Sequence, residues 1–381
     1  MSAETEKKAE QQIEQKTGRR WLIYAVIGIA VALLLVLYLW TQTSSLDKLK
    51  RFVRYSGRHF ASFSVSVPDA GACVIAGDRL CTASQDGVSA YAADGRLVFR
   101  VGAPYRDPAI KAAGDCILCY EIGGRQLSLL DTGGKERFSL HTDGRIYDAE
   151  VAQSGAVTVL TEGDGCRAVA EVYSKKGALL FRHESKSRYL NACALSPDGD
   201  YLAVNALGQE DIRFASAAML FATDSEVMQA ELSLDAQMIY DMAFLDDETL
   251  CAVGESSLQF FKADGTLLRE YALQNGSLSA YRFADGIAAA AYDLLSGGSA
   301  LVLLDAQGKE LAYAEIDSPV LHLSICGSYL SVLTGRELRV YDCSLRLCGS
   351  TENQGWLAAL VRSDGTAMCL TGSGAVLYIP G

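Results

Sequence analysis

Residues Val88–Phe99 read VSAYAADGRLVF, which is a strand-like run, an Asp-Gly turn and a second strand-like run. Asp-Gly supplies the positive φ angle that a tight hairpin needs. The same phrase returns with its glycine at Leu127–Phe138, Val172–Phe181, Leu258–Leu268 and Leu301–Leu311. Degenerate copies without the glycine lie at Met219–Gln229 and Leu338–Leu347. The stretch is therefore one unit of a repeated hairpin.

A second signature precedes each hairpin, and it consists of a turn followed by a short strand with a small third residue. Examples are Asp78–Ala83, Asp200–Val204, Glu248–Val253, Ser328–Val332 and Thr366–Leu370. The units begin near residues 71, 112, 146, 189, 239, 280, 320 and 356. Four strands in about forty residues are typical of a β-propeller blade. We therefore expect an all-β fold, a β-propeller of about eight four-stranded blades over residues 60–381, with seven blades as the alternative.

The last unit contains three strand candidates, Trp356–Val361, Ala367–Thr371 and Ala375–Ile379. A fourth strand is available in Phe60–Val67, which alternates and has no blade of its own. A strand donated from the other end of the chain would close the ring and remove an open sheet edge.

A stretch of twenty uncharged residues, Trp21–Trp40, precedes the repeats. At about 1.5 Å per residue a helix of this length crosses a hydrocarbon core of about 30 Å. The run is longer than a signal-peptide core, and no small-residue cleavage site follows it. We expect a charged cytoplasmic tail (1–20), one transmembrane helix (21–40), a basic juxtamembrane linker (41–59) and the propeller (60–381).

The orientation of this anchor is predicted from the basic residues that flank it. Arg19 and Arg20 lie directly before the apolar run, whereas the first basic residue after it is Lys48. Basic residues favour the cytoplasmic side. We therefore expect a single-pass protein of the cell membrane with an extracytoplasmic C-terminal domain.

Charge excludes one class of partner. Residues 60–381 contain 24 basic and 41 acidic residues, which gives a net charge of −17. A domain this acidic repels the phosphate backbones of nucleic acids. We therefore expect no nucleic-acid partner.

The cysteines and histidines do not form a recognisable metal or cofactor site. Cys81 and Cys251 occupy the strand position that Ala203 and Ser331 take in other units, so we expect small core residues there. Cys343 and Cys348, around a hairpin, are the one pair placed to form a disulfide. The four histidines are scattered, and none has a second ligand at metal spacing. We expect no metal and no cofactor.

A family resemblance rests on Leu195–Val204, which reads LSPDGDYLAV. This phrase is similar to the turn-and-strand phrase of WD40-like and quinoprotein-like propellers, although no Trp-Asp dipeptide closes a blade here. With its N-terminal anchor, the whole chain resembles an uncharacterised bacterial family of single-pass membrane-anchored β-propellers, a domain of unknown function. The resemblance implies a fold and no activity.

The first strand of each blade should line a central channel, so the starts of these strands should meet at one mouth. Aligning six of them brings together polar and aromatic residues: Tyr147, Asp148, Asn191, Tyr240, Asp241, Tyr281, Arg282, His322 and Trp356. Such a ring could hold a ligand, with the polar groups directing hydrogen bonds and Tyr147, Tyr240 and Trp356 offering stacking faces. The alternative is that these groups only join neighbouring blades and channel water.

The sequence favours a binding function over a catalytic one. The first hypothesis is a membrane-tethered binding or scaffold module for a protein, peptide or glycan partner in the cell envelope. There are two alternatives. One is an enzyme, either a glycan hydrolase or a quinoprotein-like oxidoreductase, and the other is a structural subunit of an envelope assembly. We predict no catalytic residue.

Overall fold

The computed structural model describes Tyr24, residues 26–31, Leu33 and residues 44–55, 60–63, 72–102, 105–210, 213–234, 238–274, 276–372 and 374–381. The chain divides into two compact units, Met1–Gly57 and Arg58–Gly381. In the first unit, Tyr24, residues 26–31 and Leu33 are helical, and helix α2 spans Ser44–Arg54. Among the described residues no helix is both long and apolar enough to cross a membrane. Most of the expected span 21–40 lies outside those residues.

The second unit is a β-propeller, and its described residues form eight antiparallel sheets of four strands. The expected all-β, eight-bladed architecture is confirmed. Blades 1 and 2 contain β2 (Cys73–Ala76), β3 (Arg79–Ser84), β4 (Gly87–Tyr91), β5 (Leu97–Val101), β6 (Pro108–Ala113), β7 (Cys116–Glu121), β8 (Gln126–Asp131) and β9 (Glu136–His141). Blades 3 and 4 contain β10 (Ile146–Val151), β11 (Val157–Glu162), β12 (Ala168–Tyr173), β13 (Leu179–Ser185), β14 (Tyr189–Leu195), β15 (Tyr201–Glu210), β16 (Arg213–Ala222) and β17 (Met228–Leu232).

The remaining blades follow the same order. Blades 5 and 6 contain β18 (Asp241–Phe244), β19 (Thr249–Val253), β20 (Ser257–Lys262), β21 (Leu267–Ala272), β22 (Ser277–Ala284), β23 (Ile287–Asp293), β24 (Ser299–Leu304) and β25 (Glu310–Ile316). Blades 7 and 8 contain β26 (Val320–Cys326), β27 (Tyr329–Thr334), β28 (Glu337–Asp342), β29 (Leu347–Glu352), β30 (Ala358–Val361), β31 (Ala367–Thr371), β32 (Gly374–Tyr378) and β1 (Phe60–Phe63).

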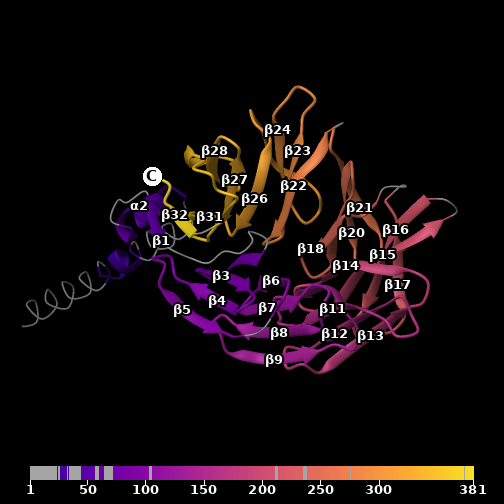
Figure 1. Ribbon diagram of the computed structural model, residues 1–381. Coiled ribbons are helices and arrows are strands. Elements are labelled where there is room, and N and C mark those ends of the chain that lie inside the picture. Colours follow the sequence, from indigo (N-terminus) through magenta and orange to yellow (C-terminus); the bar gives the residue numbers. More distant parts are fainter. Residues whose placement is uncertain are drawn as a thin grey trace, which may run out of the picture. The chain divides into compact units, whose positions relative to one another are not determined.

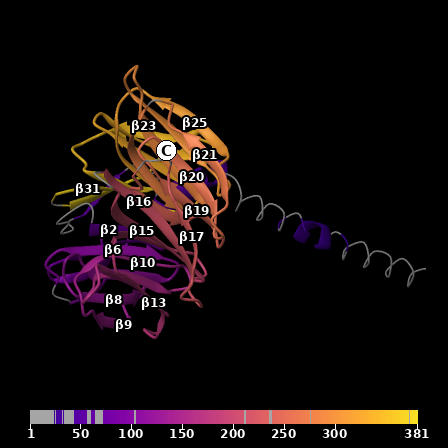
Figure 2. The same cartoon turned by 90° about the vertical axis from the view of Figure 1, so that its right-hand side faces the viewer.

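The blades follow one another around a ring in chain order, as Figure 1 shows. Contacts between first strands run from β2 to β6, from β10 to β14 and from β26 to β30, so these strands surround the axis. Contacts from blade 4 to β18 of blade 5 place these two sheets side by side, which Figure 2 shows from another direction.

The ring closes in blade 8, whose strand order is β1-β32-β31-β30. Phe60 pairs with Tyr378 and Phe63 with Ala375, so a strand from before the first blade completes the last one. This confirms the expected closure, although β1 ends at Phe63 and residues 64–67 lie outside the described chain.

The hydrophobic core lies between the blades. Each cluster of buried apolar side chains joins two neighbouring sheets, as Phe181 of blade 3 and Phe221 of blade 4 do with ring centroids 5.3 Å apart. In blade 6 the run Ala288–Ala291 is fully buried on both faces of β23. Small side chains let adjacent sheets approach closely, which explains why the second strands are rich in Ala, Ser and Cys.

The cysteines fit this packing. All eleven are free thiols, and seven of them are buried. Cys81 and Cys251 are fully buried, as are Ala203 and Ser331 at the corresponding position of other second strands.

The repeated glycine joins consecutive blades. Gly134 has a φ of +87°, and a Cβ added there would lie 2.5 Å from the ring of Phe99 in the preceding blade. Gly177 has a φ of +79°, and its Cβ would lie 3.1 Å from the ring of Phe138. In blades 2 and 3 the hairpin turn therefore rests on the phenylalanine that ends the repeat phrase of the previous blade, whereas Gly265 of blade 5 meets Ala230 and Gly308 of blade 6 meets Phe260. The repeat is a contact surface as well as a turn.

Gly134→Ala should be more destabilising than Gly123→Ala. Both positions have positive φ, +87° and +70°, so both alanines strain the backbone by about 1 kcal/mol. A Cβ at Gly123 meets nothing within 4 Å, whereas one at Gly134 displaces Phe99. We expect an additional loss of about 1–3 kcal/mol in the free energy of unfolding for Gly134→Ala, measured by denaturant unfolding. Equal losses would show that the Gly134–Phe99 contact does not stabilise the ring.

Candidate functional site

The first strands of several blades carry a β-bulge near their beginning. Register shifts fall between Ile146 and Asp148, Leu190 and Ala192, Leu278 and Ala280, and Val320 and His322. In blades 5 and 8 the residue before the first strand takes the same place, because the amides of Tyr240 and Leu357 donate to Val253 and Leu370 at 2.8 Å. We call these six residues the mouth ring: Tyr147, Asn191, Tyr240, Ser279, Leu321 and Leu357.

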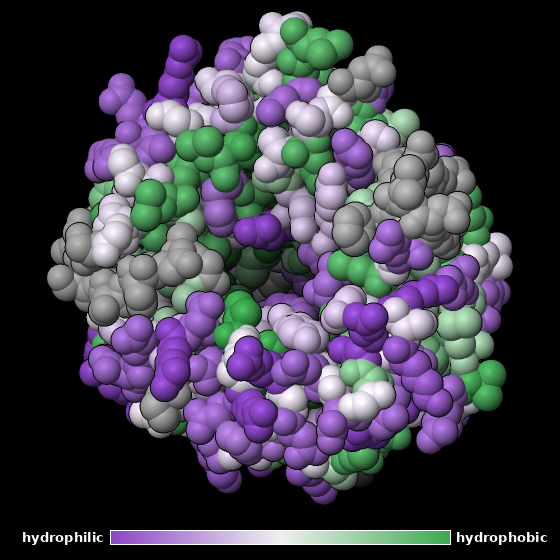
Figure 3. All heavy atoms as spheres, turned by 45° about the vertical axis from the view of Figure 1, so that its right-hand side comes forward, coloured by the Kyte–Doolittle hydropathy of each residue, from purple (hydrophilic) through white to green (hydrophobic). Residues whose placement is uncertain are grey.

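The mouth ring is exposed although it belongs to buried strands. Tyr147 is 37% exposed, Tyr240 49%, Leu321 60% and Leu357 62%. Side chains along a strand point alternately to its two faces, and a bulge redirects one of them. Bulges are therefore common next to binding sites. Figure 3 shows a hollow at the centre of one face of the molecule, with polar and apolar side chains gathered around it.

The residue before each mouth-ring position is an anchor in the core. Ile146, Leu190, Ile239 and Val320 are buried, and Trp356 takes the same place in blade 8. Trp356 is 3% exposed and packs in the cluster between blades 7 and 8. Its ring therefore offers no stacking face to a ligand, and Leu357 is the exposed residue of that blade.

Three of the expected residues directly follow the mouth ring at corresponding positions: Asp148, Asp241 and His322. The other two expected polar residues, Asn191 and Arg282, do not lie at the position of Asp148. Asn191 is itself in the mouth ring, and Arg282 lies two residues beyond the place that Asp148 occupies. Tyr281, next to Arg282, is half-buried against Phe283.

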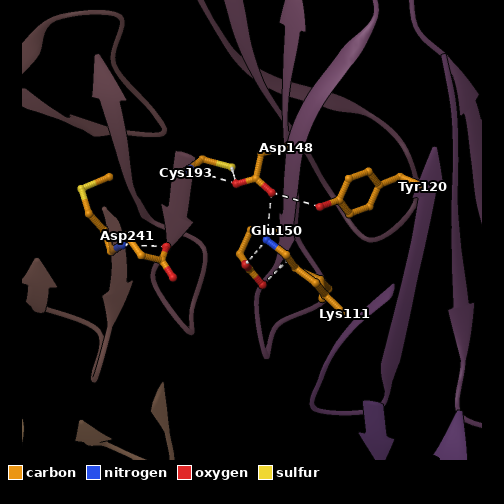
Figure 4. A network of polar contacts seen from close by, with 8 residues as sticks. Lys111, Tyr120, Asp148, Glu150, Cys193 and Asp241 are labelled. Atoms are coloured by element: carbon orange, nitrogen blue, oxygen red, sulfur yellow. Dashed lines mark hydrogen bonds and ion pairs between the residues drawn. The ribbon is translucent and has the colours of Figure 1, made fainter. Parts of the chain in front are cut away.

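Asp148 belongs to a polar network that crosses three blades (Figure 4). The Nζ of Lys111 on β6 lies 2.9 Å from Asp148 Oδ1 and 2.9 Å from Glu150 Oε2. The Tyr120 hydroxyl donates to Asp148 Oδ1 at 3.0 Å, and the Cys193 amide donates to Asp148 Oδ2 at 3.2 Å. One lysine thus forms ion pairs with two carboxylates on the same face of β10.

The network lies within protein but remains open to water. The side chains of Lys111, Asp148 and Glu150 are 32%, 18% and 31% exposed. Burial opposes the charge of Lys111, but Glu150 and Asp148 outweigh it and hold its pKa well above the usual value. Burial raises the pKa of Glu150, and Lys111 partly opposes this. The charge of Lys111 and the charges of Asp148 and Glu150 therefore stabilise one another.

Asp241 accepts a hydrogen bond and forms no ion pair among the described residues. Its Oδ1 accepts from the Met242 amide at 2.8 Å. Burial raises the pKa of Asp241, and the Met242 amide, the positive charge of Lys111 and the nearby Tyr281 hydroxyl only partly oppose the shift. In Figure 4 its carboxylate points towards the group formed by Lys111, Asp148 and Glu150.

His322 is neutral in this setting. Burial and the positive charge of Arg282 lower its pKa to about 4. Its Nδ1 is buried and has no hydrogen-bond partner among the described residues. Arg282 is exposed, and its Nη1 donates to the Tyr281 carbonyl at 2.8 Å.

The described residues contain no group of three His, Cys, Asp or Glu side chains that could hold a metal ion. A cavity of about 340 Å³ lies elsewhere, at the outer strands and turns of blades 2 and 3. Its lining is Asp131, Lys135, Glu136, Arg137, Lys175 and Lys176, and it shares no residue with the channel network.

Sequence reasoning missed Lys111, Tyr120, Glu150 and Cys193. The repeat pattern predicts that this unit begins near residue 112, which leaves out Lys111, whereas β6 begins at Pro108. Glu150 could have been found, since it lies two residues after Asp148 and so shares its face of the strand. A lysine among small residues in PAIKAA was the remaining signal.

Lys111→Met should destabilise the propeller in a pH-dependent way. Removing the cation leaves two neighbouring carboxylates without a counter-ion, which we expect to cost about 1–3 kcal/mol at pH 7–8 because channel water relieves part of the penalty. The loss should shrink towards pH 4. Carboxyl groups whose pKa is raised in the folded state bind protons more tightly there than in the unfolded chain, so acidification favours folding.

The measurement is urea unfolding of the full-length protein at several pH values, with Lys176→Met as control. Lys176 is exposed and forms no ion pair among the described residues, so its replacement should change stability by less than about 0.5 kcal/mol at any pH. A Lys111→Met loss that is independent of pH would contradict the ion-pair account.

Comparison with solved structures supports the fold. The crystal structure of BamB from Moraxella catarrhalis superposes with a TM-score of 0.53 at 16% sequence identity, over 84% of this chain and 96% of that one. This likeness concerns the fold alone. No curated protein matches the sequence. A family model matches residues 58–351, which is most of the propeller. The chain belongs to the family of unknown function DUF5711.

Proposed function

We propose that this protein is a membrane-tethered, non-enzymatic binding module whose propeller receives a segment of a protein partner at the mouth ring. One observation carries this proposal: four large side chains, at Tyr147, Tyr240, Leu321 and Leu357, are exposed at equivalent irregular positions around one axis. Exposed apolar groups that are rimmed by polar ones are typical of interaction sites.

The rigidity of the frame also favours binding. Each mouth-ring residue follows a residue that points into the core between two blades, so the exposed side chains are held in place before a partner arrives. Preorganised aromatic and apolar anchors lose little conformational entropy on binding. The polar network behind them would select a partner by its hydrogen bonds and charge.

The tether is proposed from the apolar run 21–40 and from helix α2. In α2 the side chains of Phe52 and Val53 are 64% and 71% exposed, beside basic residues at 48, 50 and 54, whereas Arg51 is buried. Such a helix is suited to a lipid surface. We propose that the propeller lies outside the cytoplasm, as the arginine pair before the apolar run favours.

Replacing both mouth tyrosines should abolish partner capture. In Tyr147→Ser with Tyr240→Ser we expect the amount of the partner co-purifying from native membranes to fall at least tenfold, with the melting temperature unchanged. The control is Leu267→Ser with Leu268→Ser, because these outer-strand side chains are similarly exposed at 52% and 37%. If the control loses the same partner and the mouth variant keeps it, the binding surface is the outer rim.

The orientation can be tested by labelling introduced cysteines with a membrane-impermeant maleimide. Asp224→Cys, at an exposed turn of blade 4, should react in intact cells, whereas Lys7→Cys should react only after permeabilisation. The unmodified chain gives the background from its four partly exposed cysteines. The reverse labelling pattern would place the propeller in the cytoplasm.

A further inference from the structure

Two aspartates occupy the same place in two blades. Asp148 in blade 3 and Asp241 in blade 5 each follow an exposed mouth-ring tyrosine and begin the regular pairing of a first strand. A tyrosine hydroxyl lies close to each of them: Tyr120 donates to Asp148, and Tyr281 lies near Asp241. The two aspartates therefore correspond in strand position, although blade 5 has Ala243 where blade 3 has Glu150.

The two aspartates differ in their counter-ion. Lys111 lies 2.9 Å from Asp148, and no ion pair to Asp241 forms among the described residues. A carboxylate that is largely removed from water without a cation is an unfavourable arrangement, and an arriving cation would relieve it. In Figure 4 the carboxylate of Asp241 is directed towards the group formed by Lys111, Asp148 and Glu150.

From this difference we infer that the partner's segment inserts a lysine or arginine side chain through the mouth ring, and that Asp241 binds its cation as Asp148 binds Lys111. The inference rests on the proposed function and names the chemistry of the partner. Tyr240, 49% exposed and directly before Asp241, would cover the aliphatic part of the entering side chain or face its charge.

The charge of the whole domain agrees with a basic partner. Residues 60–381 carry a net charge of −17, which attracts a basic segment and speeds its encounter. Near the channel, Lys111 is already held between Asp148 and Glu150, so its charge is not available to an acidic ligand. A neutral or acidic segment would leave Asp241 without a cation.

The test is binding of fluorescein-labelled hexalysine to the full-length protein, followed by fluorescence anisotropy at about 150 mM salt. Asp241→Asn should weaken binding about tenfold, because the isosteric amide keeps the hydrogen-bonding shape and removes the charge. Asp224→Asn is the matched control: it changes the net charge equally, at an exposed turn, and should alter affinity less than twofold. Hexalysine with acetylated side chains should bind Asp241→Asn and Asp224→Asn at least as tightly as it binds the unmodified protein.

Equal weakening by Asp241→Asn and Asp224→Asn would overturn the inference, because it would show attraction to the acidic surface alone. Thermal unfolding checks the fold: Asp241→Asn should melt at or above the temperature of the unmodified protein, since it removes a partly buried carboxylate that forms no ion pair among the described residues. Partner capture separates the two proposals. If the Tyr147→Ser, Tyr240→Ser variant loses the native partner and Asp241→Asn keeps it, the mouth ring is the binding site and the basic side chain is not its ligand.

Discussion

The structure depends on the pairing of β1 with β32, which joins the two ends of the propeller into one sheet. Without it, β32 would present an open edge and blade 8 would lack its outer strand. A buried arginine joins blade 8 to blade 1: a guanidinium nitrogen of Arg362, in the first turn of blade 8, lies 3.6 Å from Asp78 Oδ1, and another lies 3.4 Å from Asp364 Oδ2. Closure fixes the angle between every pair of blades, and so it fixes where the first strands meet.

Closure also explains how a site can arise from irregular positions. The interior of each interface between blades is filled by apolar side chains, so a bulge at the start of a first strand has one direction open to it, towards the axis and the solvent. The same local device, repeated in consecutive blades, gathers side chains that are about forty residues apart in the chain. The ring needs no long loops to build this surface, because its symmetry brings the residues together.

The fold was predictable because its signal is repeated. The glycine and the phenylalanine of the hairpin phrase recur, and the structure shows why: Gly134 rests on Phe99 and Gly177 on Phe138. The site was predictable only in part. The beginning of a first strand has no mark in the sequence, so the alignment pairs Asp148 with Asn191, one residue before its true counterpart, and with Arg282, two residues after it. The alignment puts Trp356 at the place of Tyr147, whereas in the structure it takes the place of Ile146 and packs in the core. The partnership of Lys111 with Asp148 links residues 37 positions apart, and no local pattern encodes it.

The central claim is that this protein works through the mouth ring. Site-specific photocrosslinking in living cells tests it directly, with a photoreactive amino acid placed at position 147, 240 or 268 of the full-length chain. Positions 147 and 240 belong to the mouth ring, and position 268 is an equally accessible place on the outer strand β21. The account predicts one shared covalent adduct from positions 147 and 240 and none from position 268. An adduct from position 268, with none from either mouth position, would contradict it.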